Sequence, residues 1–250
     1  MQTKRSASLY LIRTKKDDIG MMSITRKMFL IYMLFIGLFI SFTSNHVLSF
    51  SENRSLDEKI KQFLDSHTYR WRDMNVPEAD GKVLYDLIIA NNYTQALEIG
   101  TSTGHSAIWI AWALSKTGGR LITIEIDEKR CRQAQANFEE CGLSDFIDAR
   151  LADAHELVPE LEGPFDFVFC DADKSWYKNY FIAVLPKLEA GGCFTAHNVA
   201  NRGMRGIRDF LDYIEGLSDM KTVIDRSSMS GISISYKIER NNHLFFIQFL

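Results

Sequence analysis

The sequence has no cysteine framework and no surplus of basic residues. Its four cysteines include no Cys-x-x-Cys pair, which argues against a disulfide scaffold and agrees better with a reducing compartment. Cys170 and Cys193 lie inside apolar runs, so we expect them to be buried thiols. With 29 Lys and Arg against 32 Asp and Glu, the formal net charge is −3. The composition therefore gives no reason to expect a nucleic-acid partner.

The signatures of several enzyme classes are also missing. No Cys–His arrangement offers a covalent nucleophile. The glycine spacing is not the dinucleotide pattern Gly-x-Gly-x-x-Gly, and no Walker lysine follows a glycine loop. No internal repeat or low-complexity tract appears. What is present is ordinary globular composition, 46% hydrophobic and 24% charged over 250 residues, which fits one domain with an appendage.

The appendage is a basic N-terminal region followed by an apolar run. Residues 28–42, MFLIYMLFIGLFISF, follow seven Lys and Arg residues and have the length of a signal-peptide core. The run is shorter than the about 20 residues of a spanning helix, but no Asp, Glu, Lys or Arg lies between the run and Glu52, so an anchor is the alternative. A buried core helix is a weaker interpretation, because the run is apolar on every face. We predict a signal or anchor within residues 1–50, with membrane contact through 28–42.

This segment also predicts where the protein resides. The basic flank should stay in the cytoplasm, which makes the rest of the chain exported or membrane-anchored. A start downstream of Met1 would instead leave the protein cytoplasmic. We assign residues 51–250 to one catalytic domain.

Within that domain, apolar strand-like runs alternate with helical stretches. This alternation predicts an α/β fold: a doubly wound, mostly parallel seven-stranded sheet with helices on both faces. The final run alternates polar and apolar residues, as an edge or antiparallel strand does. The predicted strands are 95–99, 120–126, 146–151, 165–170, 192–196, 221–226 and 231–238, and the predicted helices are 51–70, 74–92, 105–115, 127–141, 154–161, 175–189 and 204–217.

The first predicted strand ends in a glycine-rich turn, EIGTSTGHS, at residues 98–106. Glycines allow a tight turn and a close approach to a ligand, and the next helix begins with free N–H groups. Glu98 is an acid in an apolar strand, where an unpaired carboxylate is costly. The second strand also ends in an acid, Glu125, at a position that commonly accepts hydrogen bonds from ribose hydroxyls. A nucleoside-type ligand without pyrophosphate fits this pattern, and a turn without a ligand is the alternative.

Polar side chains also follow the third, fourth and fifth strands. Asp153 can cap the next helix or meet an adenine amino group. Asp171 and Lys174 follow the fourth strand, and His197 and Asn198 follow the fifth. Oxygen ligands suit Mg²⁺ or Ca²⁺, whereas imidazole favours zinc, iron, nickel or copper. From these residues alone, a metal site and a set of capping acids with a solvated lysine are equal alternatives.

Four aromatic residues could form a substrate slot. Trp109 and Trp112 lie in an apolar helix, and we predict that they belong to the core. Trp176 and Tyr177 directly follow the fourth-strand site, so for them core and slot are equal alternatives.

Together these motifs resemble the class I S-adenosylmethionine-dependent O-methyltransferases of the catechol and caffeoyl-CoA type. The similarity covers about residues 71–238, and the motifs occur in the family's order. It implies the Rossmann-like methyltransferase fold and methyl transfer to a small, catechol-like hydroxyl substrate, and it favours a homodimer. The matching segments are MNVPEADG (74–81), the glycine motif LEIGTSTGHSAIWIA (97–111), the ribose strand LITIEID (121–127), DADKSWY (171–177) and GGCFTAHNV (191–199).

The resemblance also implies a role for individual residues. Lys174 would be the catalytic base that takes the hydroxyl proton. Glu125 would hold the ribose of S-adenosylmethionine, and Asp153 or Ala154 would lie near its adenine. The residues implied to bind this cofactor are Val76, Glu98, Gly100, Ser106, Glu125, Asp153, Ala154 and Asp171.

The chain departs from the family pattern at one position. Where the family has Asp-Asn, this sequence has His197-Asn198, so the implied metal ligands become Asp171, His197 and Asn198. Losing a carboxylate should weaken binding of a hard ion such as Mg²⁺. Three outcomes stay open: a softer divalent metal bound through His197, no metal with His197 as base or donor, or a decayed site. A metal-independent methyltransferase and a non-catalytic nucleoside-binding module are the rival functions.

Overall fold

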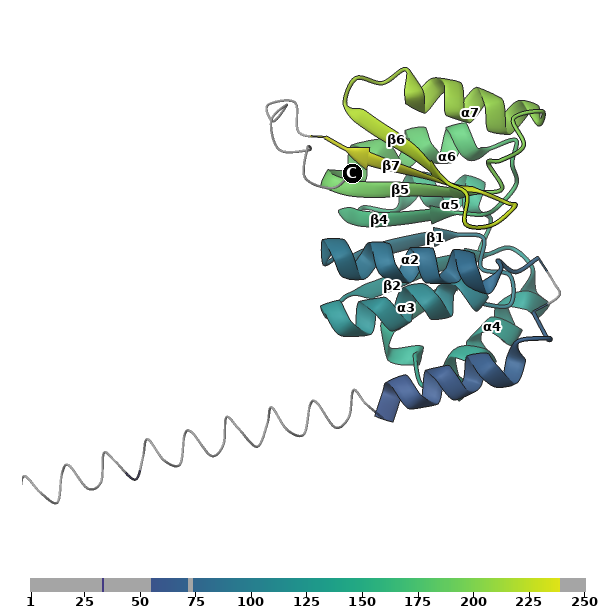
Figure 1. The fold of residues 1–250 in the computed structure, drawn as a ribbon, viewed down its shortest axis with the longest axis vertical. Coiled ribbons are helices and arrows are strands. Elements are labelled where there is room, and N and C mark those ends of the chain that lie inside the picture. Colours follow the sequence, from purple (N-terminus) through teal and green to yellow (C-terminus); the bar gives the residue numbers. More distant parts are fainter. Residues whose placement is uncertain (1–32, 34–54, 72–73, 239–250) are drawn as a thin grey trace, which may run out of the picture. The chain divides into compact units, whose positions relative to one another are not determined.

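The computed structural model describes residues 33, 55–71 and 74–238 (Figure 1). The predicted signal or anchor, 28–42, lies outside the described residues except for Met33, so it stays a prediction, as do the domain boundary and the cellular location. Among the described helices, none is long and apolar enough to cross a membrane.

The sheet has seven strands in the order β3-β2-β1-β4-β5-β7-β6. β1 to β5 pair in parallel, and β7 runs antiparallel to both of its neighbours. The predicted mostly parallel sheet with an antiparallel last strand is therefore confirmed, although β7 is an inner strand and β6 forms the edge. The strands are β1 (Gln95–Ile99), β2 (Arg120–Glu125), β3 (Ile147–Leu151), β4 (Phe165–Cys170), β5 (Leu188–His197), β6 (Met220–Asp225) and β7 (Ile232–Lys237).

Each predicted helix is present, but several are shorter than predicted, among them 74–92, observed as α2, and 175–189, observed as α6. The predicted helix 175–189 ends early because a 3₁₀ turn containing Pro186 follows it, and β5 already begins at Leu188. The predicted strand 192–196 is correspondingly too short. A first helix covers residues 55–67, and the others are α2 (Glu78–Asn91), α3 (His105–Thr117), α4 (Glu128–Cys141), α5 (Ala154–Glu160), α6 (Tyr177–Val184) and α7 (Arg205–Glu215).

Two apolar cores lie between the sheet and its helices, one on each face. Two are needed because successive side chains of a strand point to opposite faces of the sheet. Residues of α2, α3 and α4 fill the core on one face, and residues of α5, α6 and α7 fill the other (Figure 1). Trp109 is buried in the first core and Trp112 packs against it, which confirms their prediction as core residues. Cys170 and Cys193 are free and buried, as expected.

The same alternation decides which side chains of β5 face α2. Cys193 belongs to the core beneath α2, whereas Phe194 and Ala196 belong to the opposite core. His197 continues the series of Cys193 and therefore points toward the side of α2. Because β1, β2, β4 and β5 run in parallel, their carboxyl ends meet at one edge of the sheet, where ligands bind in folds of this type.

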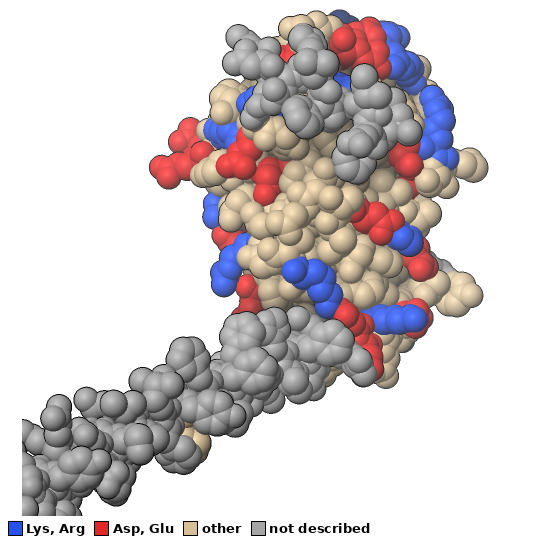
Figure 2. All heavy atoms as spheres, turned by 60° about the vertical axis from the view of Figure 1, so that its left-hand side comes forward, with Lys and Arg blue, Asp and Glu red and all other residues tan. Residues whose placement is uncertain are grey.

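Charge is spread rather than gathered on the face drawn in Figure 2. Acidic and basic side chains are interspersed there around a central area without charge. This face shows no single basic surface among the described residues. The expected absence of a nucleic-acid partner stays a prediction from composition.

Candidate active site

A cavity of about 780 Å³ lies at the carboxyl edge of the strands. Most of the predicted site residues line it, and their individual roles stay predictions. Val76, Glu98 and Ser106 lie outside its lining and are buried. The predicted residues in the lining are Gly100, Glu125, Asp153, Ala154, Asp171, Lys174, His197 and Asn198.

Gly100 is required by its backbone conformation and by its neighbour. Its φ of +98° lies in the left-handed region, which disfavours other residues. A Cβ at Gly100 would lie 2.7 Å from the backbone oxygen of Asp171. The glycine therefore brings the turn after β1 against the turn after β4, so that both walls belong to one cavity.

Glu125 anchors the turn after β1 through backbone N–H groups. Its Oε2 accepts a hydrogen bond from the Ser102 N–H at 2.7 Å, and its Oε1 accepts one from the Asp127 N–H at 2.9 Å. An ionised carboxylate offers about four lone-pair sites. Glu125 can therefore hold the turn and still accept a hydrogen bond from a ligand hydroxyl on the cavity side.

Glu98 lies behind this turn and has no exposed surface. Its Oε2 accepts a hydrogen bond from the Thr123 hydroxyl at 2.5 Å, while its Oε1 is buried without a hydrogen-bond partner among the described residues. Burial raises the pKa of Glu98 to about 8 against the lowering effect of Ser106 and Thr123, and the nearby charges of Asp171 and Glu125 add to the rise.

The turn after β3 is held by Asp153, which caps α5. Its side chain accepts a hydrogen bond from the His155 N–H at 2.9 Å, so the capping interpretation is confirmed, and it also lines the cavity. His155 is a cavity residue that no sequence motif singles out, and its ring stacks on Trp176 with ring centroids 3.9 Å apart. Tyr177 is fully buried, and its hydroxyl donates to the His197 backbone oxygen at 3.2 Å.

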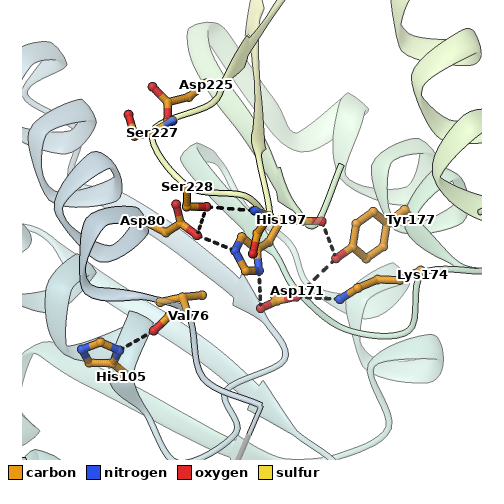
Figure 3. Close-up of polar contacts among 11 residues, drawn as sticks. Val76, Asp80, His105, Asp171, Lys174, Tyr177, His197, Asp225, Ser227 and Ser228 are labelled. Carbon is orange, nitrogen blue, oxygen red and sulfur yellow. Dashed lines mark hydrogen bonds and ion pairs between the residues drawn. The ribbon is translucent and has the colours of Figure 1, made fainter. Parts of the chain in front are cut away.

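The turns after β4 and β5 carry a chain of charged side chains (Figure 3). Lys174 Nζ lies 2.6 Å from Asp171 Oδ1, and His197 Nδ1 lies 3.1 Å from Asp171 Oδ2. On its other side, His197 Nε2 lies 2.7 Å from Asp80 Oδ2, which also accepts a hydrogen bond from the Ser228 hydroxyl at 2.8 Å. We call these five residues, Ser228, Asp80, His197, Asp171 and Lys174, the charged chain.

His197 is the central member of the charged chain and is 4% exposed. Carboxylate oxygens only accept hydrogen bonds, so both ring nitrogens must donate, which an imidazole does only in its protonated form. Burial lowers the pKa of His197, but the hydrogen bonds and charges of Asp171 and Asp80 outweigh it and raise this pKa to about 9. In this arrangement both nitrogens of His197 serve as donors to carboxylates.

Asp80 lies in the first turn of α2, where an acid is favourable. The sequence does contain a further signal, because Asp80, Leu84 and Ile88 follow one another at intervals of four and all are buried. An acid on the apolar face of a helix needs a partner, since a buried unpaired carboxylate is costly. The pattern does not reveal that His197 is this partner.

A second hollow, of about 620 Å³, adjoins the cavity and shares Lys174, Asn198 and Ser230 with it. Met204 and Met229 also line this hollow and are exposed by 43% and 98%. Lys174 is the one charged residue among those lining it, all of which are described. The hollow thus places an uncharged surface beside the lysine amine.

Comparison with known proteins assigns the fold and the family. A family model described as O-methyltransferase matches residues 48–209, well over half of the chain. The chain is 39% identical over 134 residues to the catechol O-methyltransferase of Niastella koreensis, covering 52% of this chain and 60% of that protein. It is 33% identical over 129 residues to the catechol O-methyltransferase of Mycobacterium tuberculosis, covering 51% and 58%. The chain thus matches less than two thirds of the length of these relatives.

Solved structures share the same architecture. An O-methyltransferase from Bacillus cereus in complex with SAH has a TM-score of 0.62 at 28% identity, covering 74% of this chain and 90% of that one. An O-methyltransferase from Streptomyces achromogenes, involved in tomaymycin synthesis and solved with SAM, has a TM-score of 0.64 at 27% identity, covering 73% and 90%. With the Rossmann-like sheet and the family model in agreement, the chain belongs to the O-methyltransferase family.

Proposed function

We propose that the protein transfers a methyl group from S-adenosylmethionine to a hydroxyl of a small, catechol-like acceptor. The observation that carries this proposal is a single cavity with two kinds of wall. The glycine turn after β1, held by Glu125, forms one wall, and the Lys174–Asp171 pair forms the other. The names of the two relatives support the acceptor class. The SAH and SAM bound by the solved neighbours support the donor.

The residues present fit this methyl donor. The cavity volume of about 780 Å³ lies within the range of small-molecule sites. Gly100 leaves room where a side chain would clash with Asp171, and Glu125 keeps lone pairs for ribose hydroxyls. Asp153 and Ala154 line the part of the cavity after β3, where the adenine would lie.

The transfer needs alignment and a base rather than a covalent nucleophile. The acceptor oxygen attacks the methyl carbon, the bond from that carbon to sulfur breaks, and S-adenosylhomocysteine leaves as a neutral thioether. The hydroxyl proton passes to Lys174, whose ammonium form in the resting pair with Asp171 first gives up a proton to solvent. Asp171, 2.6 Å from Nζ, orients the amine and stabilises the ammonium that forms.

The hollow beside Lys174 supports a flat, uncharged acceptor. Met204 and Met229 offer flexible thioether side chains, which make favourable contacts with aromatic rings. The hollow has no arginine in its described lining to pair with phosphates. A small hydroxyaryl compound therefore suits this surface better than a phosphate-bearing thioester.

We also propose that the protein is a homodimer, as the family resemblance favours.

Two measurements test the proposed function. Titration calorimetry with S-adenosylmethionine should show binding at one site per chain, and mass spectrometry should show one methyl group added to catechol. Failure to bind the donor would refute the proposal. Donor binding without transfer to a panel of hydroxyaryl acceptors would favour the non-catalytic nucleoside-binding module.

A further inference from the structure

The charged chain uses the atoms that Asp171 and His197 would offer to a metal ion. Both carboxylate oxygens of Asp171 have a cationic partner, and both ring nitrogens of His197 have a carboxylate partner (Figure 3). Oδ2 of Asp80 is shared between His197 and Ser228. Each charged group of the charged chain thus has a partner of opposite charge, while Oδ1 of Asp80 is buried without a hydrogen-bond partner among the described residues.

A divalent cation does not fit this donor set. A metal at either ring nitrogen would require His197 to lose a proton and to break a contact of 3.1 Å or 2.7 Å. It would also remove the partner of a buried carboxylate, which is strongly destabilising. Among the described residues, no group of three or more His, Cys, Asp or Glu side chains is placed to hold one metal ion.

The charge at this position explains how the site is balanced without such an ion. A carboxylate at position 197 together with a bound divalent cation would carry one net positive charge. The His197 imidazolium carries the same charge. With Lys174 it neutralises Asp80 and Asp171, so the four charges sum to zero.

We propose that His197 takes the place of a divalent cation, holding Asp80 and Asp171 together, and that the protein neither binds a metal at this position nor needs one. His197 is then a positioning residue: it ties the start of α2 to the end of β5 and fixes Asp171 against Lys174. As an account of catalysis this rests on the proposed methyl transfer, whereas its prediction about metal binding does not.

Metal titrations of the full chain test the proposal without any variant. After treatment with EDTA, the wild-type protein is titrated with MgCl₂, MnCl₂ and ZnCl₂ by calorimetry, and its Tm is measured with and without each salt. We expect no binding at this site, an unchanged Tm, and equal turnover with and without EDTA. One metal per chain in the wild type, lost in His197→Asn, would overturn the proposal. A signal that persists in both His197→Asn and Asp171→Asn arises elsewhere and agrees with the proposal, whereas one that is lost in Asp171→Asn would also overturn it.

His197→Asp supplies the converse test. This change crowds three carboxylates together, so the variant should melt at a lower temperature than wild type in EDTA. Added MgCl₂ should raise its Tm by several degrees, because a ligand that binds only the folded state stabilises it. A variant that folds but whose Tm does not change with added metal would contradict the proposal that the His197 charge replaces that of a divalent cation. Donor binding is measured separately, so a failure of the proposed function would not be confused with a failure here.

Discussion

The two halves of the carboxyl edge are built by different means. After β2 and β3, Glu125 and Asp153 are fixed by backbone N–H groups, the most distant of them 23 residues away. After β4 and β5, Asp171 and His197 are fixed by other side chains, and the partner of His197 on α2 is 117 residues away. The first half follows from local chain geometry. The second exists only once α2 lies over the end of β5.

This difference has energetic consequences. A carboxylate that caps a helix contributes about 1 kcal/mol to stability. Removing one partner of a buried ion pair costs about 3–5 kcal/mol, because the remaining charge stays buried without compensation. The two halves should therefore respond very differently to substitution, and the following predictions run from the largest expected effect to the smallest.

Lys174→Ala tests the half of the edge that contains Asp171 and His197 through the rate of methyl transfer. Loss of a general base typically lowers turnover by about 10²–10⁴-fold. Donor binding should remain, because the half of the edge that contains Glu125 and Asp153 is unchanged. Steady-state kinetics and calorimetry measure the two quantities. Lys178→Ala is the matched control, since Lys178 lies four residues later, in α6, with its amine over the Tyr213 ring. Equal turnover in wild type and Lys174→Ala would remove Lys174 from the proposed role.

Asp80→Ala tests the same half through stability. It leaves His197 with Asp171 as its one carboxylate partner among the described residues, in a site where Asp80 is fully buried. We expect the free energy of unfolding in urea to fall by about 3–5 kcal/mol. Asp86→Ala is the control on the same helix, because Asp86 pairs with Lys82 at the exposed surface and should cost less than about 1 kcal/mol. Similar losses in both variants would show that the Asp80–His197 pair contributes no more to the free energy of unfolding than an exposed pair does.

Glu98→Gln tests the buried acid between the two halves through pH. Because the pKa of Glu98 is raised to about 8, its contribution to stability is fully present below the unfolded pKa and is lost as pH rises through about 8. Glutamine does not ionise, so the variant should gain stability relative to wild type between about pH 5 and about pH 9. Urea unfolding across this range measures the difference, with the exposed Glu128→Gln as control. A difference that does not change with pH would contradict the raised pKa.

Asp127→Ala tests the backbone-anchored half and should have the smallest effect. Asp127 caps α4, and its side chain accepts a hydrogen bond from the Arg130 N–H at 2.9 Å. We expect a loss of about 1 kcal/mol in the free energy of unfolding, the usual value for a helix cap. A loss as large as that of Asp80→Ala would erase the distinction between the halves.

The same distinction explains what could be predicted from the sequence. Strands β1 and β4 were predicted at their observed bounds, 95–99 and 165–170, because apolar runs and flanking turns are local signals. The early end of α6 was missed because a 3₁₀ turn can continue a helical pattern of apolar residues. The carboxyl edge was predicted from strand order, but the pairing of Asp80 with His197 depends on how a helix crosses a sheet, which no local pattern records.

The covalent attachment of His197 has a consequence for the conditions under which the protein can work. Catechol-like compounds are themselves chelators, and their paired oxygens compete for hard divalent ions. An enzyme that binds a divalent cation from solution competes for that cation with an excess of free acceptor. A cation that belongs to the polypeptide cannot be removed in this way. Under the proposed function, the site would stay assembled at high acceptor concentration and in media poor in divalent ions.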